Sequence, residues 1–196
     1  MTVNVQKRRR YRVRRMTREL SAEREMSPGR RLYMLLTVIA AAGVFAGAYS
    51  YSGGEINAEG GFVSAFVTSL CSVGIYVLLF FFGGLSAAGQ PVGYILCFFK
   101  GLGTGYLAAY ATCAMKSGDV CAALNILPFE AVSMVTVILG ARENIRMSSY
   151  ISGRSFGASG AASDEGSLRL YLAKFALILL TGIAAAAVRG LMAAVL

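Results

Sequence analysis

The feature that most constrains this chain is a run of 40 residues, 60–99, without a single charged side chain. One helix of that length would extend ~60 Å, about twice the thickness of a bilayer's hydrocarbon core. The run must therefore turn within itself, and Gly83-Gly84 and Gly89-Gln90-Pro91 supply residues that favour a turn. This predicts two membrane-spanning helices, over residues 61–82 and 91–111.

Three further apolar stretches are each long enough to span a bilayer. The stretch 32–51 contains Ala46-Gly47-Ala48, which resembles a signal-peptidase site. We interpret it as a retained span, because the preceding region is unusually long and the rest is membrane-like. The prediction is an all-α, polytopic integral membrane helical bundle of about five transmembrane helices. The fourth helix is expected to be broken at Pro128, by a kink or by a re-entrant turn. A sixth, broken membrane segment at this proline is an alternative. The remaining predicted spans are 32–51, 121–141 and 170–196, with a polar connector at 142–168 that is rich in Gly and Ser over 152–163.

The charge of the chain is very unevenly distributed. The formal net charge is +9, yet residues 1–31 hold 11 basic and 3 acidic residues, so the remaining 165 residues contribute only +1. We expect residues 1–31 to form a basic cytoplasmic tail and 32–196 a helical transmembrane domain, with the outer loop 53–60 acidic and the inner loop 142–169 basic. The basic cluster within 7–18 suits anionic lipid headgroups. No nucleic acid is expected as a partner, because the cluster has neither a nucleic-acid-binding fold nor an aromatic platform.

Several kinds of chemistry are disfavoured by the residue types present. The chain has no His, which excludes a Ser-His-Asp triad and a His-bound metal. Its four Cys residues have no CxxC spacing, which argues against zinc and thioredoxin-like sites. We therefore expect no enzyme, no catalytic residue, and no metal or other cofactor.

Two ionisable residues, Lys100 and Glu130, lie deep inside predicted spans. Their depths from the cytoplasmic ends of the spans are ~14 Å and ~16 Å, both near the middle of the bilayer. A lone charge at that depth costs several kcal/mol, so intramembrane charges usually pair or face water. We expect Lys100 and Glu130 to form an intramembrane polar pair. A structural clamp between helices is the favoured role, and a proton or substrate path is the alternative.

Small residues recur every four positions in three of the predicted spans, which lets helix backbones approach closely. Packing within the chain is the expected role, and a lateral partner helix is the alternative. Arg189, in the outer half of the last span, either snorkels outward or meets an acidic partner. The small residues are Gly43 and Gly47, then Gly101, Gly105 and Ala109, and finally Gly182, Ala186, Gly190 and Ala194.

A pattern over residues 95–141 resembles a known family. The segment ILCFFKG at 95–101, followed by Gly105-Tyr106, resembles the FLKG…GF element of the stage II sporulation protein M family. The segment LNILP at 124–128 resembles that family's LP element, which precedes an apolar helix and then basic residues. Phe129-Glu130 stand where sporulation members favour amide side chains.

The resemblance covers about residues 30–196 and implies a sporulation role. It implies a membrane scaffold that recruits stage II sporulation proteins D and P, which degrade peptidoglycan, to the septum during engulfment. The location implied is the bacterial cell membrane, at the mother-cell septal or engulfing membrane, with the N-terminus cytoplasmic. The alternative function is a small membrane transporter or permease subunit with a midplane site at Lys100 and Glu130.

Overall fold

The computed structural model describes residues 28–53, 61–155 and 164–195. The chain divides into two units, Met1–Met34 and Leu35–Leu196, and every contact described below lies within the second. Most of the predicted cytoplasmic tail, including the lipid-binding stretch 7–18, lies outside the described residues.

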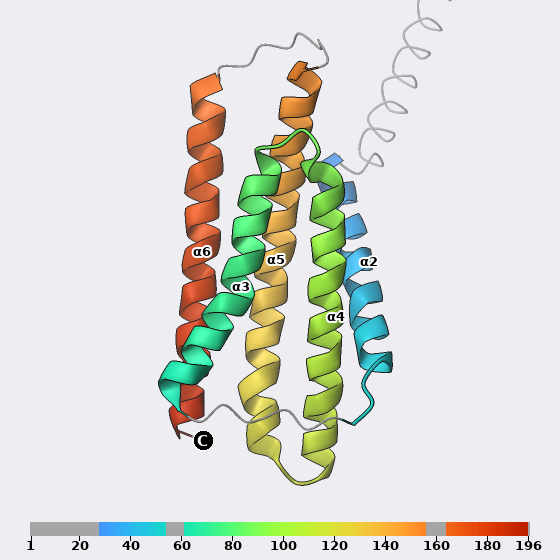
Figure 1. Cartoon of the computed structure of the whole chain (residues 1–196), viewed down its shortest axis with the longest axis vertical. Helices are drawn as coiled ribbons and strands as arrows, with labels where there is room; N and C mark the ends of the chain where they lie inside the picture. The colour runs from blue at the N-terminus through green and yellow to red at the C-terminus, as the bar shows by residue number, and fades with distance from the viewer. Residues whose placement is uncertain (1–27, 54–60, 156–163, 196) are drawn as a thin grey trace, which may run out of the picture. The chain divides into compact units, whose positions relative to one another are not determined.

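The regular secondary structure of the described residues is all helical, and the five helices that it contains are long and apolar enough to cross a membrane. Successive helices of the second unit run in alternating directions (Figure 1). The predicted all-α fold with five spanning helices is therefore confirmed. The helices are α2 (Pro28–Tyr49), α3 (Phe62–Gly84), α4 (Gly89–Lys116), α5 (Val120–Ser155) and α6 (Asp164–Val195).

Short connections join three of these helices into a continuous up-and-down path. The α3–α4 turn falls within the predicted glycine-rich segment, and Ser86 donates its backbone N–H to the Gly83 carbonyl there. Between α4 and α5, Gly118 takes a positive φ of 95°, which glycine adopts without steric cost. Asp119 then accepts the backbone N–H of Ala122 at 3.1 Å and so caps the first turn of α5.

The fourth spanning helix is longer than the sequence indicated. We expected it to end at residue 141, but α5 continues to Ser155 and α6 begins at Asp164 rather than at residue 170. The polar stretch after 141 is helical because one of its faces is buried: Asn144 and Ser148 are fully buried and Ile145 nearly so. At 1.5 Å per residue α5 is ~54 Å long, so it extends well beyond a ~30 Å hydrocarbon core.

Pro128 lies inside α5, and the helix continues on both sides of it. A re-entrant turn at this proline, one of the two forms expected, is therefore wrong. Proline removes one intrahelical N–H donor, the one that would bond to the carbonyl four residues earlier. The apolar surroundings favour keeping all the other backbone bonds, because no water replaces them. A kink at Pro128 stays a prediction.

Helix α5 packs against α3, α4 and α6, and α3 also packs against α4 and α6. Figure 1 shows α5 running behind α3 and between α4 and α6. The buried side chains are mostly apolar, and the largest that are fully enclosed include Phe80 on α3, Leu36 on α2 and Val137 on α5. Polar side chains are also buried, and these define the candidate site.

The first two sets of small residues bring α2 and α4 into backbone contact. A Cβ at Gly47 would collide with the carbonyl oxygen of Leu102, and one at Gly105 would collide with that of Val44. Gly43 and Gly101 face each other across the same crossing. Ala109 is half-buried, outside this closest approach.

The third set packs α6 against α3. A Cβ at Gly182 would lie 3.0 Å from Val73, and one at Gly190 would lie 3.0 Å from the ring of Phe62. Ala186, between them, is fully buried. Ala194, in contrast, is exposed. Close packing within the chain thus uses most of the small residues, and these faces are not available to a partner helix.

Candidate functional site

The two predicted intramembrane charges form a direct ion pair. Lys100 Nζ on α4 donates to Glu130 Oε2 on α5 at 2.8 Å. Only 5% of the lysine side chain and 4% of the glutamate side chain are exposed. The similar depths of the two residues in the sequence predicted this pairing, and the structure brings them together.

Two hydroxyl groups complete the surroundings of the Glu130 carboxylate. Thr104, one helical turn after Lys100, donates from Oγ1 to Glu130 Oε2 at 2.7 Å. Ser133 lies 3.4 Å from the same oxygen and 3.0 Å from the Glu130 backbone carbonyl. These hydroxyls are at i+4 and i+3 from the two charges, a spacing that places them on the same helix faces. Helical spacing from Lys100 and Glu130 could therefore have identified both residues from the sequence.

The pair has the properties of an interhelical clamp. Lys100 and Glu130 neutralise each other, and the carboxylate oxygen that binds the lysine also accepts hydroxyl hydrogen bonds. A buried ion pair of this kind contributes little net stability by itself, but removal of one partner leaves an uncompensated buried charge. We therefore expect the pair to hold α4 in register against α5.

A second cluster of charges, which the sequence analysis did not find, lies further along α5. Glu143 accepts from Lys174 of α6 at 2.8 Å and lies 3.4 Å from each of Arg142 and Arg146. It was missed because the helix was expected to end at residue 141. The signal that could have found it is the recurrence of small or polar residues, Gly140, Asn144 and Ser148, every four positions.

Beside this cluster, buried polar side chains bind the last turn of α3. Asn144 donates from Nδ2 to the carbonyl of Phe80 at 2.7 Å, and Tyr171 of α6 donates to the carbonyl of Phe81 at 2.8 Å. The last four carbonyls of a helix have no intrahelical donor, and the carbonyl of Phe81 is the first of these four in α3. Two residues from neighbouring helices thus hold the C-terminal end of α3 within the bundle.

Arg189 of α6 has different partners from Lys100. Its Nη1 donates to Ser69 Oγ of α3 at 2.9 Å, and its guanidinium carbon lies 5.1 Å from the centre of the Phe129 ring. Within the described ranges, no acidic side chain forms an ion pair with it. A contact of Arg189 with an acidic group of a partner protein, one of the two possibilities expected, stays a prediction.

The fold and these buried polar contacts define an all-helical, multi-pass membrane protein. Comparison of the chain with protein-family models, with curated proteins and with solved structures finds no match in any of the three. The resemblance to the stage II sporulation protein M family therefore stays a prediction.

Proposed function

We propose that this protein is a non-enzymatic membrane scaffold whose helical bundle presents its apolar outer surface to other membrane proteins. The observation that carries the proposal is the use of the deepest charges, Lys100 and Glu130, inside the bundle, where both are buried and hydrogen-bonded. A buried ion pair whose charges already neutralise each other favours a rigid scaffold over a site that exchanges protons or solutes.

The outer surface of the bundle is consistent with such a role. All five helices expose large apolar side chains, which lipid or another membrane helix can cover. Examples are Phe45 on α2, Val63 on α3, Phe99 on α4, Val135 on α5 and Leu177 on α6.

The resemblance over residues 95–141 supports a more specific role in sporulation. On that basis, the proposed partners are the peptidoglycan-degrading stage II sporulation proteins D and P. The proposed location is the mother-cell septal or engulfing membrane, with the basic tail on the cytoplasmic side. The cluster within residues 7–18 would hold the tail against anionic lipid, because each basic residue near such a surface contributes ~1 kcal/mol.

Affinity purification from sporulating cells tests the scaffold role. The full chain, tagged and solubilised in mild detergent, should recover both wall-degrading proteins above the level obtained with an unrelated tagged multi-pass protein. Cells sampled before sporulation provide the second control. Equal recovery with the scaffold candidate and the unrelated protein would overturn the proposal.

A second candidate function is transport, favoured by the position of Glu130, which is the eleventh residue of the membrane-spanning helix α5 and so lies ~15 Å from its start, about half the thickness of a hydrocarbon core. Intramembrane carboxylates are common in proton and solute pathways. Ion or solute flux into proteoliposomes that contain the full chain, abolished by Glu130→Gln, would support transport. Absence of flux from the wild-type chain, together with recovery of the wall-degrading proteins, would support the scaffold.

A further inference from the structure

A groove of about 350 Å³ lies between α5 and α6. Apolar and small side chains form most of its walls, among them Val132 of α5 and Ala184, Ala185 and Val188 of α6. Val132 and Val188 are about half exposed, so the groove opens onto the outer surface of the bundle. In a membrane, this opening faces lipid.

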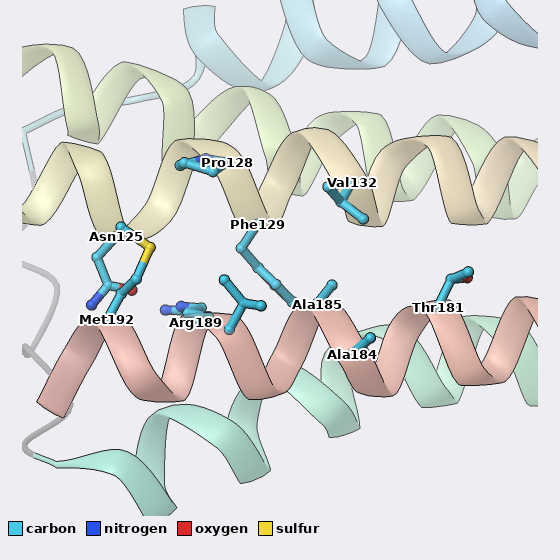
Figure 2. A pocket seen from close by; sticks show the side chains of 10 residues that line it. Asn125, Pro128, Phe129, Val132, Thr181, Ala184, Ala185, Arg189 and Met192 are labelled. Carbon is cyan, nitrogen blue, oxygen red and sulfur yellow. The ribbon is translucent and has the colours of Figure 1, made fainter.

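The groove is mostly apolar, and two polar side chains lie toward one of its ends. Figure 2 shows Asn125 and Arg189 together toward one end, with Val132, Ala184 and Thr181 toward the other. Asn125 is the sixth residue of α5, soon after the α4–α5 turn, and Arg189 lies toward the same end of the groove. At 1.5 Å per residue, Asn125 is ~8 Å from the first residue of α5. The polar end is therefore near the membrane interface, and the apolar end points toward the bilayer centre.

The polar end holds one donor and one acceptor that have no hydrogen-bond partner. Arg189 Nε and Asn125 Oδ1 are both buried atoms, and neither forms a hydrogen bond. Leaving such a group unsatisfied costs about 1–3 kcal/mol. An occupant that satisfies both must accept a hydrogen bond from a cation and donate one to an amide oxygen.

We propose that this groove binds a phosphatidylglycerol molecule. Its phosphate accepts from the guanidinium of Arg189, a hydroxyl of its glycerol headgroup donates to Asn125 Oδ1, and an acyl chain follows the apolar walls toward the bilayer centre. The charge is complementary, because Arg189 forms no ion pair within the described part of the chain. A partner helix about 10 Å across does not fit a groove of about 350 Å³, whereas an acyl chain does.

The headgroup chemistry separates this lipid from two others. Phosphatidylcholine offers a phosphate but no hydrogen-bond donor, so it leaves Asn125 Oδ1 unsatisfied. Phosphatidylethanolamine offers a phosphate and an ammonium donor, but its ammonium opposes the nearby charge of Arg189. The expected order of affinity is phosphatidylglycerol first, phosphatidylethanolamine second and phosphatidylcholine last.

Native mass spectrometry of the full chain, released from detergent with each lipid in turn, measures this order. We expect Arg189→Gln to weaken phosphatidylglycerol binding about tenfold, the size of effect usual for one charge-assisted hydrogen bond. Ala184→Phe should weaken it similarly, because the ring fills the groove and leaves the charge intact. Lys116→Gln is the matched control: it removes an exposed cation near the α4–α5 turn, outside the groove, and should leave binding unchanged.

Three results would overturn the proposal. Equal retention of phosphatidylglycerol and phosphatidylcholine by the wild-type chain would show that the headgroup is not recognised, and this measurement needs no variant. Retention of phosphatidylglycerol by folded Ala184→Phe places the lipid elsewhere. A change of oligomeric state in Ala184→Phe, with lipid binding unchanged, makes the groove a contact between protein chains.

Discussion

Lys100 and Arg189 are both cations within membrane-spanning helices, yet the structure surrounds them differently. Lys100 is buried against the carboxylate of Glu130, which also accepts a hydrogen bond from Thr104. Arg189 contacts a serine hydroxyl and an aromatic ring, and its Nε has no hydrogen-bond partner.

The difference follows from depth. Lys100 is more than ten residues from either end of α4, so its charge must be balanced by the protein itself. Arg189 lies toward the same end of the groove as Asn125, the sixth residue of α5, where the side chain is within reach of the interface and of lipid phosphate. We therefore expect Lys100 to act as a clamp between helices and Arg189 to contact lipid.

The largest expected effect on stability comes from breaking the Lys100–Glu130 ion pair, the central pair of the bundle. Lys100→Leu or Glu130→Leu should each lower the free energy of unfolding by about 3–5 kcal/mol, because each leaves an uncompensated buried charge. The double variant should recover most of that loss, since it leaves no charge. Unfolding in mixed micelles, followed by circular dichroism, measures all three.

Lys116→Leu is the control for this comparison, because it removes an exposed lysine from the same helix. It should change stability by less than about 0.5 kcal/mol. A double variant no more stable than the single variants would show that the charges do not act as a pair.

The next largest effect tests whether substitutions in α4 lower stability through lost charge pairing or through disturbed packing. Gly105→Leu should cost about 1–3 kcal/mol, because its side chain would collide with the carbonyl of Val44 on α2. Gly103→Ala is the matched control: nothing lies within 4 Å of a Cβ there, and alanine favours the helix. Adding Glu130→Leu should restore stability to the Lys100→Leu variant but not to the Gly105→Leu variant. If it restored stability to both, charge and packing would not be separate causes of the two losses.

The number of spanning helices and the central pair could be predicted from the sequence because each depends on local, one-dimensional information. A 40-residue charge-free run is too long for one span, and two charges at similar depth must compensate each other. Helix α5 beyond residue 141 could not be predicted in the same way. Its polar residues are helical because Asn144 and Ser148 bind backbone carbonyls of the α3 end and the α3–α4 turn, contacts more than 60 residues away in sequence.

The glycines illustrate the same limit. Their four-residue spacing indicated close packing, but spacing does not identify the partner helix. That α2 crosses α4 and that α6 crosses α3 follows from the three-dimensional arrangement, in which Gly43 faces Gly101 and Gly182 faces Val73.

A smaller effect is expected at Arg189, and it tests the role of depth directly. Arg189→Gln should lower the free energy of unfolding by about 1 kcal/mol, since it removes one hydrogen bond to Ser69 and one ring contact without stranding an opposite charge. The measurement is unfolding in micelles that contain no phosphatidylglycerol. A loss as large as that of Lys100→Leu would mean that Arg189 also balances a buried acid.

The smallest effect should come from the hydroxyl that supports the central pair. Thr104→Val should cost about 0.6 kcal/mol, the average for a hydrogen bond between membrane helices, because Lys100 still neutralises the Glu130 carboxylate. In the Lys100→Leu background, Thr104 is the nearest donor left to that carboxylate, so adding Thr104→Val should then cost more than it does alone. Equal costs in the two backgrounds would show that lysine and threonine act independently. The clamp would then be two separate contacts rather than one coupled site.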